Sequence, residues 1–212
     1  MDIGEQSGTA FDRNGSKHEG MGVDWGDYDN DGWLNVVLAN GHIQDNTSVM
    51  NKNTTFLQRV QLFRNREGDQ FDDVSGDLGF PTPILGRGLA IGDFDNDGRM
   101  DLLVVDSAGA PALLHNETAH AGHWIEVKLR GTRSNRDGIG ALLTFVTPDH
   151  RSLLRRCATD GSYMSASDRR VHCGLGTSTS VLVSVQWPGA GAQLYPNIAA
   201  DQIVTLTQSR QQ

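Results

Sequence analysis

Two short loops of the chain hold side-chain oxygens at spacings that suit a divalent cation. In each loop, oxygen-bearing residues stand at positions 1, 3, 5 and 9, and a glycine at position 6 allows the turn that folds them around one point. The residue at position 7 can add its backbone carbonyl. The predicted ligands are Asp27, Asp29, Asp31, Trp33 (carbonyl) and Asn35 in the first loop, and Asp93, Asp95, Asp97, Arg99 (carbonyl) and Asp101 in the second.

Calcium is the ion that this set of donors favours. Ca²⁺ takes about six to eight oxygen ligands in flexible geometry, and neither loop contains the cysteine or histidine that zinc and copper prefer. An EF-hand opens in the same way but needs a glutamate at position 12 and a helix on each side. Position 12 is Leu38 or Val104, inside an apolar run, so the sequence excludes an EF-hand.

Asp, Asn and Gly also form polar turns without any metal. Two matching loops make that interpretation weaker, because clustered carboxylates repel one another unless a cation lies between them. The second loop has four carboxylates and the first has three plus the neutral Asn35, so we expect the second loop to bind the ion more tightly.

The two loops belong to an internal repeat. Residues 20–32 align without gaps on residues 86–98, an offset of 66. Farther along, residues 62–65 match residues 113–116 at an offset of 51, so the first copy carries an insertion of 15 residues, which we place within 43–57. Repeats of this size with several short strands predict propeller blades or another stacked β array.

Short apolar and β-branched runs, bounded by Gly, Asn or Asp, predict the strands of these repeats. The runs are 21–25, 34–39, 61–64, 71–74, 89–91, 102–105 and 112–115. A propeller blade has four strands, so residues 1–118 supply about two blades, which cannot bury their faces alone. The chain opens inside the repeat pattern, at Asp2, so we expect either further blades before it in a longer polypeptide or self-association.

The pattern at 86–102, Gly-x-Gly followed by Gly-Asp-Phe-Asp-Asn-Asp-Gly and then Asp-Leu, resembles the FG-GAP (or VCBS) repeat. This is the calcium-loop blade that is also found in integrin α-chain propellers. The resemblance implies that the aspartates of each loop hold structural Ca²⁺ between blade strands. Asn35 departs from the aspartate that the family usually has at this position.

From His123 onward the acidic loops stop and alternating strands begin. The predicted strands are 124–129, 141–146, 152–156, 171–174, 181–187 and 202–207. This pattern predicts a small antiparallel β-sandwich or barrel. A short polar stretch at 118–122 sets the boundary, so we expect two domains, 1–118 and 119–212, in an all-β chain whose first part is a partial β-propeller.

The second half resembles the ASPIC/UnbV domain, which commonly follows FG-GAP repeats in extracellular proteins of the cartilage acidic protein-like family. The matching residues are 123–124, 129–132, 134–141, 161–163, 174–176 and 186–188. Cys173 stands where an aromatic residue usually precedes Gly-Leu-Gly. The resemblance implies a fold and an extracellular setting rather than a reaction.

Cysteines and histidines leave alternatives open. Cys157 and Cys173 lie on neighbouring predicted strands, where they could form a disulfide in an exported protein or remain two buried thiols. His115, His120 and His123 lie near the domain boundary and could form a junction metal site, although they do not have the spacing of a typical cluster.

Two further pairs of residues have both a binding and a structural interpretation. Arg136 and Asp137 could bind a ligand, but a turn stabilised by Asn135 and a local ion pair is the preferred interpretation. Ser162 and Tyr163 could form a sugar-facing edge, but a hairpin turn with its packing aromatic is preferred.

A catalytic role also has candidates. Glu19, Asp24 and Asp45 lie outside the metal positions, and His42 lies beside the insertion. Two carboxylates roughly 5–10 Å apart across a groove could hydrolyse a glycosidic bond. A glycoside hydrolase is therefore the alternative function.

Composition narrows the classes of function. The chain has 212 residues, 18 Lys+Arg and 26 Asp+Glu, and its net charge of −8 argues against nucleic-acid binding. Its longest apolar runs are far shorter than the roughly 18–20 residues that cross a membrane. No secretory leader follows Met1, and 25 glycines indicate a turn-rich β protein.

These observations together predict an extracellular, periplasmic or cell-surface module that binds calcium and serves adhesion or recognition. The expected ligand is a polysaccharide or an extracellular protein. The Asn-rich insertion at 43–57 is the expected contact loop, and its sequons at Asn46 and Asn53 matter only in a host that glycosylates.

Overall fold

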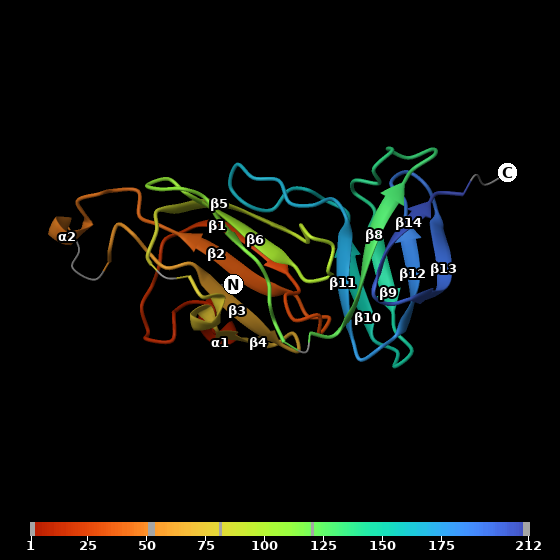
Figure 1. The fold of residues 1–212 in the computed structure, drawn as a ribbon, viewed down its shortest axis with the longest axis horizontal. Helices are drawn as coiled ribbons and strands as arrows, with labels where there is room; N and C mark the ends of the chain where they lie inside the picture. The colour runs from red at the N-terminus through yellow and green to blue at the C-terminus, as the bar shows by residue number, and fades with distance from the viewer. Residues whose placement is uncertain (1–2, 51–53, 81, 120, 210–212) are drawn as a thin grey trace.

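The computed structural model describes residues 3–50, 54–80, 82–119 and 121–209. It is built mostly of β-strands arranged in four sheets, two in each half of the chain. Figure 1 shows an elongated molecule, with the sheets of the first half toward one end and the sheets of the second half toward the other. Within the described residues, no helix is long and apolar enough to cross a membrane.

Each repeat of the first half folds into an antiparallel sheet that follows chain order. The first sheet contains β1 (Gly20–Gly26), β2 (Asn35–Asn40), β3 (Gln61–Arg66) and β4 (Gln70–Asp73). The second contains β5 (Gly86–Gly92), β6 (Asp101–Asp106) and β7 (Ala112–Leu114). The expected strand runs are thus confirmed, and the flanks of both acidic loops are strands, as the exclusion of an EF-hand requires.

The two sheets of the first half share one apolar core. Their first strands, β1 and β5, lie against each other, and buried side chains from both repeats meet between the sheets, among them Ala39, Leu62, Leu89, Leu102 and Val104. In the part of the chain that the structure describes, these two blade-like sheets form no closed propeller.

Short helical turns occupy equivalent places in the two repeats. α1 (Gly4–Ser7) and η1 (Ser75–Leu78) each end at a glycine with positive φ, Gly8 at 84° and Gly79 at 63°. The third turn, α2 (Thr47–Met50), lies in the insertion and projects at the end of the molecule farthest from the second half (Figure 1). Residues 51–53 of the insertion, including the Asn53 sequon, lie outside the described residues.

The second half is a sandwich of two sheets. One has the order β10 (Ser152–Arg156), β9 (Leu142–Val146), β12 (Ser180–Gln186) and β13 (Ala192–Ala199). The other has the order β11 (Val171–Gly176), β8 (His123–Arg130) and β14 (Gln202–Thr207). Fully buried residues such as Ile125, Phe145, Val183 and Trp187 fill the space between them.

Two details of this half differ from the prediction. The strand β13 was missed, because Pro196 interrupts its pattern, and it lies at a sheet edge, where proline is tolerated. The sandwich is also not purely antiparallel, since β14 pairs with β8 in parallel. The chain changes sheets between β13 and β14 at Asp201, which has a positive φ of 59°.

Cys157 and Cys173 are both free and buried. Cys157 directly follows β10 and Cys173 belongs to β11. These two strands lie in different sheets rather than side by side. Burial raises the pKa of Cys157 to about 11 and that of Cys173 to about 12. Of the two alternatives left by the sequence, a disulfide or two buried thiols, the structure has the two buried thiols.

Candidate metal centre

The two acidic loops join the same pair of strands in each repeat. The first loop connects β1 to β2 and is closed by the pair Gly26 and Asn35, and the second connects β5 to β6 and is closed by Gly92 and Asp101. The residue at position 9 is therefore the first residue of the second strand in both repeats.

Both loops turn through the same left-handed backbone. At position 4, Asn30 has a φ of 58° and Asn96 a φ of 64°, and at position 6, Gly32 has a φ of 97° and Gly98 a φ of 84°. Asparagine tolerates this region better than most residues, and glycine does so without steric cost. The spacing in the sequence thus encodes one turn, used twice.

Equivalent hydrogen bonds fix the carboxylates in the two loops. The position-6 amide donates to the position-1 carboxylate, at 3.0 Å in the first loop and 2.8 Å in the second. The position-7 amide donates to the position-5 carboxylate, at 2.7 and 2.9 Å. One oxygen of each of these carboxylates is thereby held in the same orientation in both loops.

The first loop gathers three aspartates. Asp27, Asp29 and Asp31 each offer an oxygen, and these atoms lie within 4.8 Å of one another. Asp27 is only 1% exposed, and neither its Oδ1 nor the Oδ1 of Asp29 has a hydrogen-bond partner, whereas Asp29 Oδ2 pairs with Arg64. Buried oxygens without a donor are costly, and a divalent cation would satisfy both, so these residues fit such an ion.

Electrostatics in the first loop also favour a bound cation. Burial raises the pKa of Asp27 to about 7, Arg155 acts in the opposite direction, and Asp31 and Asp29 raise the pKa further. The pKa of Asp31 is likewise raised, first by burial. Without a cation, the folded loop thus holds negative charge at a cost.

The second loop has the same backbone but a different set of partners. Asp93, Asp95 and Asp101 each offer an oxygen within 4.8 Å of the others. Asp97 instead forms an ion pair with Arg99. Both oxygens of Asp93 and both of Asp101 accept backbone amides, so this loop is neutralised and hydrogen-bonded by the chain itself to a greater extent than the first.

Position 9 does not act as a simple ligand in the first loop. The Oδ1 of Asn35 accepts the Asn65 amide at 2.8 Å, and its Nδ2 donates to the Trp33 carbonyl at 3.3 Å. In the second loop, Asp101 accepts the Asn116 amide at 2.8 Å and still belongs to the cluster. Position 9 therefore ties the first loop to β3 and the second loop to the segment that follows β7.

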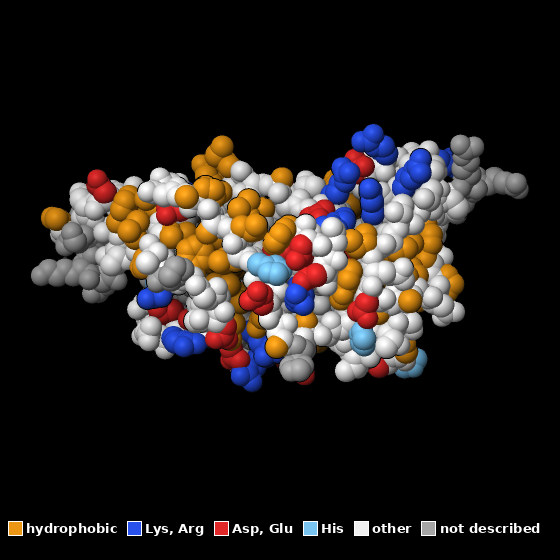
Figure 2. Space-filling model, in the orientation of Figure 1, with side chains coloured by type: hydrophobic (Ala, Val, Ile, Leu, Met, Phe, Trp, Pro, Cys, Tyr) orange, Lys and Arg blue, Asp and Glu red, His pale blue; other side chains and the backbone are white. Residues whose placement is uncertain are grey.

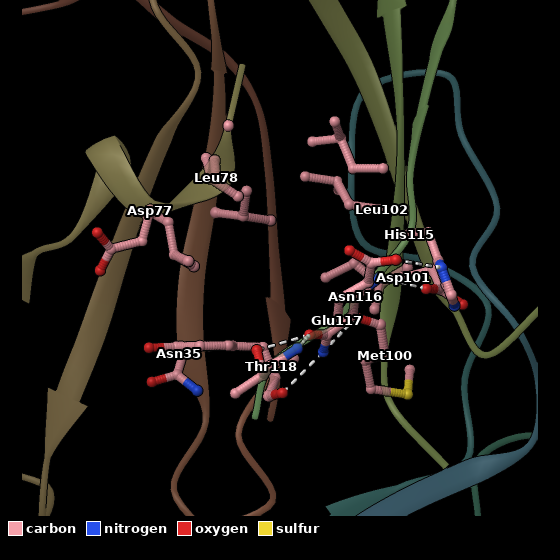
Figure 3. Close-up of a pocket in the computed structure, with 17 residues that line it drawn as sticks. Asn35, Asp77, Leu78, Met100, Asp101, Leu102, His115, Asn116, Glu117 and Thr118 are labelled. Carbon is pink, nitrogen blue, oxygen red and sulfur yellow. Dashed lines mark hydrogen bonds and ion pairs between the residues drawn. The ribbon is translucent and has the colours of Figure 1, made fainter. Parts of the chain in front are cut away.

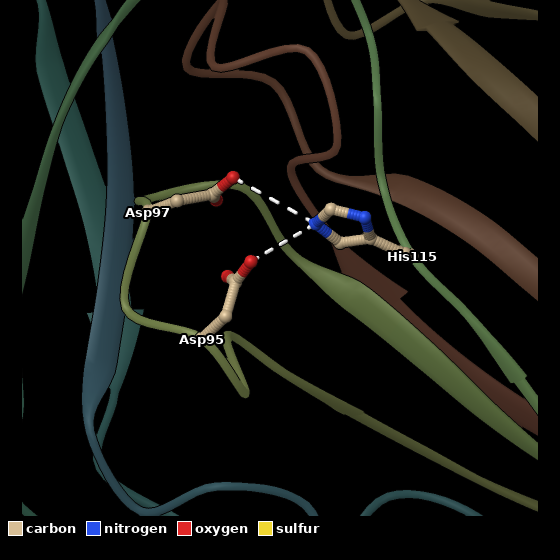
Figure 4. A group of neighbouring side chains, drawn as sticks. All are labelled: Asp95, Asp97 and His115. Atoms are coloured by element: carbon tan, nitrogen blue, oxygen red, sulfur yellow. Dashed lines mark ion pairs between the residues drawn. The ribbon is translucent and has the colours of Figure 1, made fainter.

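A basic side chain on or just after the third strand faces position 3 of each loop. Arg64 Nη2 lies 2.9 Å from Asp29 Oδ2. In the second repeat, His115 Nε2 lies 3.0 Å from Asp95 Oδ2 and 3.9 Å from Asp97 Oδ2, and both carboxylates point toward the imidazole (Figure 4). An arginine cannot ligate a metal ion, whereas a neutral histidine can.

The histidines do not form the junction cluster that the sequence allowed. His115 contacts the second acidic loop, whereas His123 pairs with Asp201 at 2.7 Å. His120 lies outside the described residues.

A pocket of about 540 Å³ lies between the two sheets of the first half. Figure 3 shows Leu78 and Leu102 on its facing walls, with Asp101, His115 and Asn116 on the side of the second sheet. The pocket reaches the position-9 residue of each loop, so it connects the two acidic loops across the space between the sheets.

The catalytic candidates lie in separate surroundings. Glu19 accepts hydrogen bonds from Thr54 and Gln58, and these bonds outweigh burial and lower its pKa. Asp24 accepts the Ser167 hydroxyl at 2.6 Å. His42 contacts its own turn through the backbone of residue 44, and Asp45 is exposed.

Of the two structural interpretations in the second half, only the turn at Arg136 and Asp137 agrees with the contacts seen. Ser162 and Tyr163 do not form a hairpin with a packing aromatic, because β10 and β11 on either side belong to different sheets and Tyr163 is 56% exposed. Asn135 bonds both to the amide and to the carbonyl of Ile139, at 2.8 and 2.7 Å, which closes the turn that carries Arg136 and Asp137. Ser162 accepts the Leu89 amide at 3.2 Å and so contacts β5.

Sequence reasoning missed the residues of the second half that contact the acidic loops. Arg151, Arg155 and Arg170 donate to backbone carbonyls of these loops. No local motif marks them, because their partners lie in the other half of the chain. Figure 2 shows acidic side chains gathered near the middle of the molecule, where the two halves meet.

Two family models match parts of the chain. Residues 44–104 match the FG-GAP-like repeat, and residues 131–212 match ASPIC and UnbV. Among curated proteins, the chain is similar to cartilage acidic protein 1 of Mus musculus and of Homo sapiens, with 23% identity over 181 residues in each case. The matched region covers 84% of this chain but 26% of either relative, so the chain spans about a quarter of their length.

Proposed function

Because the chain joins an FG-GAP-like repeat to a C-terminal ASPIC and UnbV domain, we propose that it is a calcium-stabilised recognition module. The observation that carries this proposal is the set of buried carboxylate oxygens in the first loop that lack a hydrogen-bond donor, on Asp27 and Asp29. Calcium suits these oxygens better than magnesium, which demands near-octahedral geometry and keeps several waters.

The setting that fits such a site is outside the cytosol, at the cell surface, in the periplasm or in the extracellular space. Calcium sites of extracellular modules bind with dissociation constants of roughly 10⁻⁴–10⁻³ M and need a medium rich in calcium. The role of the ion would be structural: it removes the repulsion among the carboxylates and holds the strands β1 and β2 at a fixed angle.

The insertion at 43–57 is the surface that we assign to ligand recognition. Its described residues 43–50 project away from the second half of the molecule (Figure 1) and carry apolar side chains in solvent, with Ile43 72% and Val49 85% exposed. Exposed apolar side chains on a projecting loop are typical of interaction sites. The ligand class we propose is a neutral polysaccharide or an extracellular protein, since the acidic chain would repel polyanions.

Thermal unfolding with calcium and with a chelator tests the metal part of the proposal. An ion that binds only the folded state stabilises it by about 2.7 kcal/mol at a hundredfold excess over Kd, which corresponds to a Tm rise of roughly 5–10 °C for a chain of this size. Asp29→Asn should remove most of this rise. The control Asp72→Asn changes an exposed aspartate that pairs with Arg66, and it should keep the rise.

Binding to immobilised polysaccharides and matrix proteins tests the recognition part. The double variant Ile43→Ser/Val49→Ser should lose binding while its Tm stays unchanged, because both side chains lie in solvent. Release of reducing sugar ends by the wild type, without retention on the polysaccharide, would contradict a binding module and indicate a hydrolase.

A further inference from the structure

The second half of the chain covers the first acidic loop with backbone donors. The Gly174 amide donates to Asp27 Oδ2 at 3.1 Å, and the Gly176 amide donates to the Asn30 carbonyl at 2.9 Å. Both glycines belong to β11. This strand therefore contacts the loop directly, and its contact leaves Asp27 almost completely buried.

Two arginines on or beside β10 add side-chain donors to the same loop. Arg151 donates from Nη1 to the Asp31 carbonyl and from Nη2 to the Leu175 carbonyl, both at 2.8 Å, so it bridges the loop and β11. Arg155 donates from Nη2 to the Gly32 carbonyl at 2.8 Å. These bonds hold the backbone carbonyls of positions 5 and 6.

The second loop is covered in a corresponding way by different residues. Arg170 donates from Nη2 to the Asp93 carbonyl at 2.5 Å and from Nη1 to Asn96 Oδ1 at 2.6 Å. The Trp124 ring lies so close to Gly98 that a Cβ at Gly98 would overlap it. Both loops are thus packed between their own sheets and the second domain.

This arrangement has a clear energetic consequence. The arginines bind carbonyl oxygens of the loop, and Arg155 Nη2 lies 3.8 Å from Asp27 Oδ2. Docking of the second domain therefore supplies a donor to Asp27 Oδ2, through the Gly174 amide, but none to Asp27 Oδ1, which is buried without a hydrogen-bond partner. Burial of that oxygen costs free energy, and a cation that binds it removes the cost, so docking and ion binding favour each other.

We propose that the ASPIC and UnbV domain completes the calcium site of the first loop, with Arg151 and Arg155 as positioning residues. The inference rests on the proposed function in requiring that the loop binds calcium. It goes beyond that function in making ion affinity depend on a domain that supplies no ligand. By linkage, ion binding and domain docking strengthen each other by the same factor.

Charge-conserving substitutions test the positioning role in the full chain. Arg151→Lys and Arg155→Lys keep the positive charge, but a lysine ammonium cannot reproduce the planar fork of a guanidinium. Titration of each variant with calcium by calorimetry should give a Kd at least fivefold higher than that of the wild type, the lower end of typical couplings. The matched control is Arg156→Lys, a neighbouring position on β10 whose side chain pairs with exposed Asp160 and does not touch the loop.

Hydrogen exchange in the wild-type chain provides a second readout that needs no variant. The amides of Gly174 and Gly176 donate across the junction, so chelation should speed their exchange at least fivefold. The Val183 amide, inside the sandwich core, is the internal control. Its exchange should change much less, because the core does not contact the loop.

The outcomes separate this inference from the proposed function. If the wild type shows neither calcium binding nor a Tm shift, the proposed function fails and the inference fails with it. If the wild type binds calcium but both lysine variants bind as the control does, or if chelation leaves the exchange of the two glycine amides unchanged, the function stands and the inference is wrong. Higher Kd values in both lysine variants together with faster exchange at the junction would support it.

Discussion

The pH dependence of calcium binding follows from the surroundings of one side chain. Asp27 is buried, and burial raises the pKa of its carboxyl group from 3.8 to about 7, against the opposing effect of Arg155. An ion that binds Asp27 must displace the proton that this carboxyl group holds at lower pH. Calcium affinity of the first loop should therefore fall as the pH falls through 7.

The magnitude follows from competition between one proton and one ion. With a pKa of about 7, the apparent Kd should be about tenfold higher at pH 6 than at pH 8, because the fraction of ionised Asp27 falls by that factor. Calorimetric titrations at both pH values measure the change. Titrations at pH 6 in two buffers with different ionisation enthalpies should also show release of about one proton for each ion bound.

The stability of the ion-free protein should change with the opposite sign. The folded state keeps the Asp27 proton up to about pH 7, whereas the unfolded chain loses it near 3.8. The folded state thus binds more protons in this window, so the free energy of unfolding in chelator should decrease as the pH rises from about 4 to about 7. Saturating calcium should offset that decrease.

Two results would refute this reasoning. One is a Kd for the first loop that is equal at pH 6 and pH 8. The other is a chelated protein whose stability rises over this window in the wild type and in Asp27→Asn alike. Either result would mean that Asp27 ionises as an ordinary exposed carboxyl group, so that its burial does not determine the properties of the loop.

Two further predictions concern side chains around the loops. Arg64→Gln should lower the calcium Kd by about 1.4- to fivefold, because the ion pair of half-exposed Arg64 with Asp29, worth roughly 0.2–1 kcal/mol, no longer competes with the ion. Arg66→Gln, on the same strand, should leave the Kd unchanged in the same titration. Gly98→Ala should lower the free energy of unfolding in urea by about 2–5 kcal/mol, since it combines a positive φ with overlap of Trp124. Gly15→Ala, with a positive φ and no neighbour within 4 Å, should cost only about 1–2 kcal/mol.

Each of these predictions has a result that contradicts it. Equal calcium affinity in both arginine variants would mean that the ion pair between Arg64 and Asp29 does not compete with calcium binding. Equal losses of stability in the two glycine variants would mean that Trp124 moves away without cost, and that the contact between Trp124 and Gly98 does not hold the second domain in place.

Local features of the fold could be predicted from the sequence because they depend on neighbouring residues. The acidic turns, their flanking strands and the insertion follow from spacing and from positions such as Gly32 and Gly98 that accept a positive φ. The ranking of the two loops was based on counting charges. The structure offers a different criterion for comparing the two loops, the number of hydrogen-bond donors to their carboxylates. The first loop has buried carboxylate oxygens without a donor, whereas oxygens of Asp93 and Asp101 in the second loop accept backbone amides.

Contacts between distant residues could not be predicted in this way. Arg151 meets Asp31 across 120 positions of sequence, and nothing in the residues around either one indicates the other. The parallel pairing of β14 with β8 was missed for a similar reason, since alternation of side chains indicates a strand but not its partner. The same holds for Asn35, whose Oδ1 accepts the Asn65 amide and is therefore not free to ligate an ion.

The pairing of β14 with β8 sets an order of events during synthesis. These strands are the last and first of the second half, and β11, which carries Gly174, is in the same sheet. Until residues 202–207 have left the ribosome, that sheet lacks one of its three strands. The first acidic loop is translated well before that strand, so it stays in water until the sheet that covers it is complete.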